Sequence, residues 1–252
     1  MAEVLDLGVR IGAVSGGAFD IGMGDAVRAW GFGPEAASAG AIRAAMAAAR
    51  RPAHEVLEID RAAGLVRKHT PIMLDLNGIA KGFGVDKLAG TLQGFGITAF
   101  LVGIDGEMRA SGLRPNGMPW TVAVETPDPE RRAPRSILTL TDAAVATSGD
   151  YRHHVTVRGW RLSHTMDPAT GGPLRSSPAS VTVVAGTCAE ADAWASALMV
   201  LGPQAGGELA ARLDLDALFL MRETGGIRTH AVGALFDNPT AWAVSREGLV
   251  RA

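Results

Sequence analysis

The sequence predicts an α+β fold rather than a regular alternation of parallel strands and helices. Most of the expected strands follow one another through short turns, and helices are interspersed among them. Of the 252 residues, 47% are hydrophobic and the formal net charge is only −2, so a sizeable core can form. No repeat, low-complexity tract or linker interrupts the chain, which indicates one domain.

Four main helices are expected from their composition and their end signals. The first ends at Ser15-Gly16-Gly17, because glycine favours a turn over a continued helix. The second is rich in alanine and has Pro34 near its start. The third is closed by Gly94 and Gly96, and the fourth by Gly202-Pro203, after which a short helix follows. The expected ranges are 2–14, 34–51, 79–93 and 188–201.

Strands are expected where β-branched and aromatic residues form short runs between turn residues. Two of them form a hairpin across residues 61–64, and two others meet at Arg158-Gly159. The expected strands cover, in order, residues 54–60, 64–69, 98–104, 120–126, 135–141, 153–157, 160–164, 180–186 and 217–222, with a final β segment after them.

Several functional classes do not fit the composition. Cys188 is the only cysteine, so a disulfide framework and a multi-cysteine metal site are excluded, and we interpret it as a small residue near a helix start. The sequence contains no block of basic residues, so nothing in it indicates a nucleic-acid partner. No segment approaches the roughly 20 apolar residues of a membrane span, and the N-terminus does not resemble a secretory signal. The chain as given is expected to be soluble and cytoplasmic, with its native start and any export signal left open.

Glycines alternate with polar residues in LDLNGIAKGFGVD, residues 74–86, where a strand is expected to pass into a helix. Glycine lets a ligand approach the backbone closely, and a helix N-terminus offers free N–H groups to an anion. The pattern is neither a P-loop nor a dinucleotide fingerprint. Taken alone, it is explained equally simply by a tight turn with a surface lysine.

A second polar stretch, VATSGDYRHH, covers residues 145–154. Its Thr147, Ser148 and Gly149 could present hydroxyls and backbone amides to phosphate oxygens. A capped turn without a ligand accounts for the same residues, so the stretch decides nothing alone.

The stretch WRLSHTMDPATGGPL, residues 160–174, contains more than a loop requires. Asp-Pro and Gly-Gly are sufficient for the turn. His164 is additional, and Asp167 lies three residues further on. A histidine supported by a carboxylate can act as a general base near neutral pH. A hydrogen-bonded structural histidine at a strand end is the alternative.

Asp192 and Ser196 are spaced four residues apart on a helix that is otherwise mainly apolar. Their oxygens therefore lie on one face, and burying them is costly unless something satisfies them. A hard cation such as Mg²⁺, which prefers oxygen ligands, would do so. Alternatively, Asp192 interacts with the helix dipole and Ser196 bonds back to its own helix.

The order of these motifs resembles that of the ApbE family of FAD:protein FMN transferases. SGGAFDIGMGDAVRAWGFG, residues 15–33, is similar to the upstream family pattern GGxFDxTxxPLxxxWGFG. Further matches follow in order: DLNGIAKGFGVD, VGIDGE, ATSGDY, SHTMDPATGGPL and SVTVVAGTCAEADAWASALMVLG. GIDGE stands where the family commonly has NLGGD, and it keeps Gly106 and the acidic Glu107.

The resemblance implies a Mg²⁺-dependent transfer of FMN from FAD to a Thr or Ser hydroxyl of an acceptor flavoprotein, with AMP released. It implies that His164 is the base, with Asp167 beside it in the motif. The implied metal ligands are the Gly78 carbonyl, Asp192 and Ser196. The implied FAD contacts are Ala18, Phe19, Asp20, Asp75, Lys81 and Met166.

The resemblance also implies a single domain over residues 1–252, built of mixed, largely antiparallel sheets packed by helices and short at its N-terminus relative to the family. Two alternative functions stay open. One is a module that binds FAD or metal without transferase activity. The other is an FAD pyrophosphatase that gives FMN and AMP.

Overall fold

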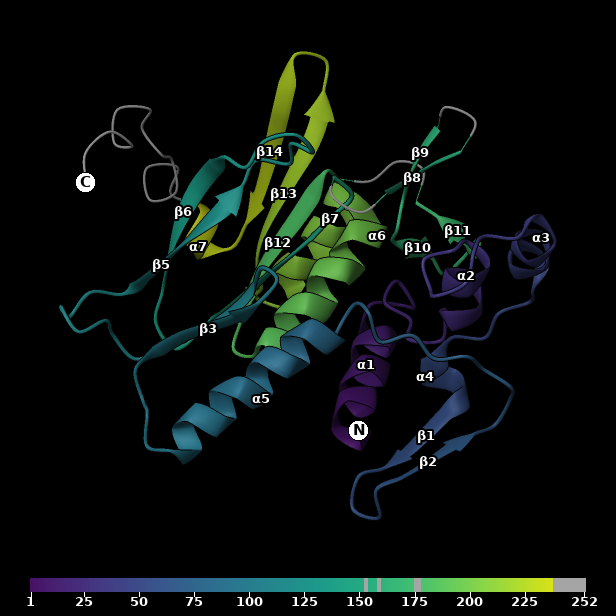
Figure 1. The fold of residues 1–252 in the computed structure, drawn as a ribbon, viewed down its shortest axis with the longest axis horizontal. Coiled ribbons are helices and arrows are strands. Elements are labelled where there is room, and N and C mark those ends of the chain that lie inside the picture. Colours follow the sequence, from purple (N-terminus) through teal and green to yellow (C-terminus); the bar gives the residue numbers. More distant parts are fainter. Residues whose placement is uncertain (152–153, 158–159, 175–177, 238–252) are drawn as a thin grey trace.

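A six-stranded sheet forms the centre of the computed structural model, which describes residues 1–252 except 152–153, 158–159, 175–177 and 238–252. The strand order is β14-β13-β12-β7-β4-β3, and each neighbouring pair is antiparallel (Figure 1). This confirms the predicted α+β class. The strands are β3 (Phe100–Ile104), β4 (Glu107–Ser111), β7 (Ala144–Gly149), β12 (Ser180–Ala185), β13 (Asp216–Glu223) and β14 (Gly226–Val232).

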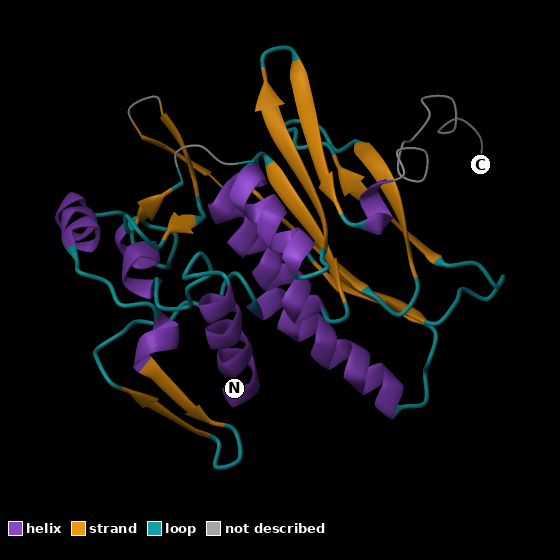
Figure 2. Cartoon of the chain, turned by 180° about the vertical axis from the view of Figure 1, so that it is seen from behind, coloured by secondary structure: helices purple, strands orange, loops and turns teal. Residues whose placement is uncertain are grey.

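One face of this sheet is covered by helices (Figure 2). The central one, α6 (Cys188–Arg212), packs on β7 and β12, while α5 (Ala80–Gly94) and α1 (Ala2–Val14) pack against α6. As the Gly-Pro signal predicts, the backbone leaves helical geometry at Gly202. Within the described part of the chain, no helix combines the length and apolar character needed to cross a bilayer.

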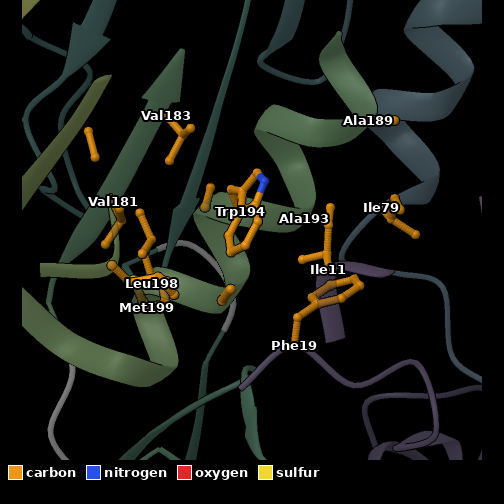
Figure 3. Packing of buried hydrophobic residues seen from close by; sticks show 14 of the residues in the cluster. Ile11, Phe19, Ile79, Val181, Val183, Ala189, Ala193, Trp194, Leu198 and Met199 are labelled. Atoms are coloured by element: carbon orange, nitrogen blue, oxygen red, sulfur yellow. The ribbon is translucent and has the colours of Figure 1, made fainter. Parts of the chain in front are cut away.

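The other face of the sheet packs against a hairpin, β5 (Trp120–Glu125) and β6 (Pro134–Leu140), and the short helix α7 (Ala234–Asp237). Their apolar side chains, such as Val122 and Leu138, meet Leu218 and Leu220 of the sheet. On the helical side, Figure 3 shows the larger core, in which Trp194 and Leu198 of α6 lie near Val181 of β12 and Ile11 near Phe19. The sheet is therefore buried on both faces.

Smaller units surround this core at the N-terminal side of α5. The hairpin of β1 and β2 and the helix α4 lie beside α1, and α2 and α3 pack near the two short pairs β8–β9 and β10–β11 (Figure 1). Their bounds are α2 (Gly24–Ala29), α3 (Ala39–Ala47), α4 (Ala53–Val56), β1 (Leu57–Asp60), β2 (Leu65–Lys68), β8 (His154–Val157), β9 (Trp160–Ser163), β10 (Met166–Asp167) and β11 (Gly172–Pro173).

The predicted first helix, the first hairpin and the helix near 79–93 are confirmed, but other expectations are wrong. The alanine-rich helix begins only after Ser38, whose hydroxyl accepts a bond from the Ala41 N–H, so Pro34 lies outside it. The strand expected before α5 is absent, since residues 71–76 form a connection without regular secondary structure. Residues 144–149 are not a turn but the central strand β7, paired on both edges by β4 and β12.

The contact between α5 and α6 depends on a glycine. A Cβ at Gly82 would lie only 2.2 Å from the carbonyl oxygen of Cys188, which is a backbone atom and cannot swing away. The two helices also cap each other. The Gly82 N–H donates to Asp192 Oδ2 at 3.0 Å, and the Cys188 and Ala189 N–H groups donate to the carboxylate of Asp86 at 3.0 and 2.9 Å. Each helix therefore satisfies N–H groups that the other leaves free.

Gly82→Ala tests this contact. We expect it to lower the free energy of unfolding by about 1–3 kcal/mol or more, because overpacking against backbone forces the helices apart. The control is Gly90→Ala on the same helix, where an added Cβ meets nothing within 4 Å. That change should raise stability by about 0.4–1 kcal/mol. Urea unfolding of both variants measures the difference, and equal stability would contradict the proposed close contact.

Candidate functional site

A cleft of about 460 Å³ opens where the N-terminus of α5, the turn between β3 and β4, β7, α6 and the loop around His164 meet. It collects all but one of the site residues expected from the sequence. Those that line it are Ala18, Phe19, Asp20, Asp75, Gly78, Lys81, His164, Met166, Asp192 and Ser196. Asp167 is the exception.

Positive charge at one side of the cleft comes from the first turn of α5. Lys81 is the second residue of this helix, and its ammonium lies 2.7 Å from Glu107 Oε1. Burial lowers the pKa of Lys81, but the hydrogen bond and charge of Glu107 outweigh it and raise the pKa overall. A charged ammonium beside a helix N-terminus is an arrangement that attracts phosphate groups.

Oxygen donors gather beside this helix start, with Asp192 and Ser196 contributed by α6. Asp192 is buried, and burial raises the pKa of its carboxyl to about 6. The hydroxyl of Ser196 lies 3.1 Å from that of Ser148. A Cβ at Gly78 would be 3.0 Å from Ser196 Oγ, so the glycine permits the backbone to come close to this hydroxyl. A buried carboxylate with a hydroxyl oxygen on the same helix face is a donor set that suits a hard cation.

Only one carboxylate belongs to this set. Among the described residues, no group of three or more His, Cys, Asp or Glu side chains could hold a metal ion. A cation here would therefore complete its shell with water or with phosphate oxygens of a ligand, as Mg²⁺ usually does.

Asp20 and Asp75 line the cleft but also make local backbone bonds. Asp20 Oδ1 accepts from the N–H groups of Gly22 at 2.7 Å and Ala53 at 3.0 Å, which fixes the chain after Phe19. Asp75 Oδ1 accepts from the Asn77 N–H at 3.3 Å. Burial raises the pKa of both carboxyls. Both residues thus shape the wall, and their predicted contact with FAD stays a prediction.

The His164 loop is anchored from outside the cleft. The carbonyl of Gly171 accepts a bond from the Trp30 indole at 3.1 Å, and Met166 is buried in a cluster with α2 and α3. Gly171 has a φ of +64°, and a Cβ there would meet the Ala45 carbonyl at 2.6 Å. The His164 ring itself lies edge-on to Phe32, with ring centroids 6.4 Å apart.

Asp167 has a structural role in this loop. Its two carboxylate oxygens accept bonds from the Ala169 N–H at 2.9 Å and the Thr170 hydroxyl at 3.0 Å. These bonds close the turn between β10 and β11. The sequence predicted a catalytic pair of His164 and Asp167; the structure places only His164 on the cleft, and the catalytic role of Asp167 stays a prediction.

Two features were interpreted differently or missed. Thr147, Ser148 and Gly149 do line the cleft, but from a strand rather than a phosphate-binding turn. Glu107 also lines it and was noted only as part of a motif. The signal for its position was present, because Asp105-Gly106 is a typical two-residue hairpin turn.

Cys188 is no part of the cleft chemistry. It is fully buried at the first position of α6, as expected from the sequence. Burial raises the pKa of its thiol, and the nearby carboxylates raise it further. Such a thiol is not a nucleophile.

Known proteins resemble this chain over most of its length. A model of the ApbE family matches residues 1–219. A protein of Vibrio cholerae, named FAD:protein FMN transferase, is 37% identical over 224 residues, which are 88% of this chain and 67% of the relative. One of Salmonella typhimurium with the same name is 36% identical over 234 residues, covering 91% and 67%. The chain thus spans about two thirds of the length of these relatives.

Solved structures agree. The apo form of the Pseudomonas stutzeri flavinyl transferase ApbE superposes with a TM-score of 0.79 at 38% identity, over 93% of this chain and 73% of that one. The flavin transferase ApbE from Vibrio cholerae gives a TM-score of 0.78 at 34% identity, over 93% and 75%.

Proposed function

The chain belongs to the ApbE family, and we propose that it is an FAD:protein FMN transferase that moves FMN from FAD to a Thr or Ser hydroxyl of an acceptor protein and releases AMP. The observation that carries this proposal is the single cleft. It brings the Lys81 ammonium, the oxygen donors of Asp192 and Ser196 and a histidine together from motifs far apart in the sequence.

The Gly78 carbonyl, Asp192 and Ser196 would hold Mg²⁺. Bound there, the ion supplies charge neutralisation for the phosphate oxygens of FAD. The protein's own part is positioning. Asp192 is held by the Gly82 N–H, and Ser196 by its bond with Ser148. The Lys81 ammonium, which also lines the cleft, would bind the diphosphate.

His164 would remove the proton from the acceptor hydroxyl as its oxygen attacks the phosphorus of the FMN half. The new P–O bond joins FMN to the acceptor, and the bond to the AMP phosphate breaks, so AMP leaves. Such a step is accelerated mainly by positioning and by stabilising charge. The anchoring of the loop through Trp30 and Met166 supports this role, because it holds His164 at the cleft.

Mass spectrometry tests the function. The protein, FAD, Mg²⁺ and a peptide that offers a Thr or Ser are mixed, and the peptide mass is followed. We expect a gain equal to FMN minus water, with AMP in solution. FMN and AMP with an unmodified peptide would instead indicate the pyrophosphatase, and intact bound FAD would indicate a binding module.

Asp192→Asn tests the metal site. The amide keeps an oxygen for the Gly82 N–H but loses the charge, so we expect a folded protein whose Mg²⁺-dependent FAD affinity falls at least about tenfold. Calorimetry with FAD, with and without Mg²⁺, measures it. Asp60→Asn is the control, because Asp60 only accepts a bond from the Ala63 N–H on the exposed first hairpin. Unchanged Mg²⁺ and FAD affinity in Asp192→Asn would show that the metal assignment is wrong.

His164→Ala separates the base from binding. FAD affinity should stay nearly unchanged, while FMN transfer slows by about 10²–10⁴, the usual contribution of an acid–base group. Because a base must be unprotonated, the unaltered enzyme should slow as the pH falls through about 6.5, the ordinary value for histidine, within about one unit. His69→Ala, at an exposed site beside β2, is the control. Full transfer activity in His164→Ala would show that another group removes the proton from the acceptor hydroxyl.

A further inference from the structure

Glu107 is a buried carboxylate at the edge of the cleft. It is the first residue of β4, and its side chain is only 3% exposed. One oxygen, Oε1, accepts a hydrogen bond from the Lys81 ammonium at 2.7 Å. The other, Oε2, is buried and has no hydrogen-bond partner among the residues that the structure describes.

Stability does not explain this arrangement. Burying a carboxylate costs free energy that a single partner repays incompletely, and an apolar residue of similar size is often at least as stable. Burial also raises the pKa of Glu107, against the opposing effect of Lys81. Buried titratable groups beside a ligand cleft are typical of functional sites.

The backbone holds Glu107 rigidly. Ile104 and Glu107 face each other across β3 and β4, and the two residues between them form the tightest type of hairpin turn. Asp105 and Gly106 both have positive φ, 50° and 107°, as a type I′ turn requires. The turn therefore fixes the backbone of Glu107 relative to the sheet, and the burial of the side chain restricts the carboxylate.

Lys81, in contrast, has a long stem and a side chain that is 41% exposed. An ammonium of this kind samples many positions unless a partner holds it. It carries three N–H donors, and the bond to Glu107 uses one. The pair thus keeps the ammonium beside the first turn of α5 with donors left for a second acceptor.

We propose that Glu107 is a positioning residue for FAD: its buried carboxylate fixes the Lys81 ammonium at the N-terminus of α5, where the ammonium meets the FAD diphosphate. This rests on the proposed function in taking FAD as the ligand. The acidic residue of the GIDGE stretch acts on the ligand through the lysine and not by direct contact.

A double-mutant cycle on FAD affinity, measured by calorimetry with Mg²⁺ present, tests the proposal. The variants are Glu107→Gln, Lys81→Met and the two combined. We expect Glu107→Gln to weaken FAD binding by up to about 10²-fold, the size of effect that a misplaced group can have. In the Lys81→Met background the same change should have little further effect, because coupled residues are not additive. Equal losses in both backgrounds would make Glu107 a structural residue and overturn the proposal.

Two further variants protect the test. Glu107→Asp keeps the charge but shortens the side chain, so it should also weaken FAD binding if position matters; affinity equal to that of the unaltered protein would contradict positioning. If Glu107→Gln does not fold, Glu107→Asp replaces it in the double-mutant cycle with Lys81→Met. Glu3→Gln is the matched control, because it breaks the exposed ion pair between Glu3 and Lys87, a lysine on α5 like Lys81. FAD affinity should not change in this variant.

The proposed function and this proposal fail separately. A coupled loss of FAD affinity without FMN transfer to any peptide would leave the positioning role standing and reject the transferase. FMN transfer to the peptide, together with equal effects of the Glu107 change in both backgrounds, would support the transferase and reject the positioning role. If FAD does not bind the unaltered protein, both are wrong.

Discussion

The close crossing of α5 and α6 is the constraint on which the rest of the site depends. Glycine is the only residue type that, at position 82, lets the backbone of α5 approach the Cys188 carbonyl so closely. At this distance the carboxylate of Asp192 reaches the first turn of α5, and that of Asp86 reaches the first turn of α6. The two helix N-termini are thereby placed side by side, and Lys81 of α5 and Asp192 of α6 both line the cleft.

This crossing explains why one carboxylate has two tasks. Asp192 Oδ2 accepts the Gly82 N–H, which stabilises the helix start, while the residue also lines the cleft. Its burial and raised pKa, about 6, show that its charge is not fully compensated by the protein. A cation would compensate it, so helix packing and the proposed metal binding would draw on the same group. The site is therefore part of the core and not an addition to its surface.

The sequence allowed the fold class, α1, the first hairpin and α5 to be predicted, because their signals are local. The strands β4 and β7 were missed for different reasons. β4 follows an Asp-Gly turn that was available as a signal, whereas Ala144–Gly149 contains small and hydroxyl residues that form a strand only because β4 and β12 flank them. The order of the motifs was sufficient to name ten of the residues that line the cleft. The pairing of Lys81 with Glu107 joins two side chains that are 26 residues apart, and no spacing in the sequence indicates it. The bonds of Asp167 to Ala169 and Thr170 are local, and an Asp that bonds the backbone two residues on is a turn signal.

The most direct test of this account is a crystal structure with Mn²⁺ in place of Mg²⁺ and FAD bound, with the ion located by its anomalous signal. We expect one peak beside Asp192, Ser196 and the Gly78 carbonyl, with Asp192 Oδ2 still accepting the Gly82 N–H. A peak away from Asp192, or an Asp192 that has left Gly82 to bind the ion, would contradict the claim that the helix crossing builds the site.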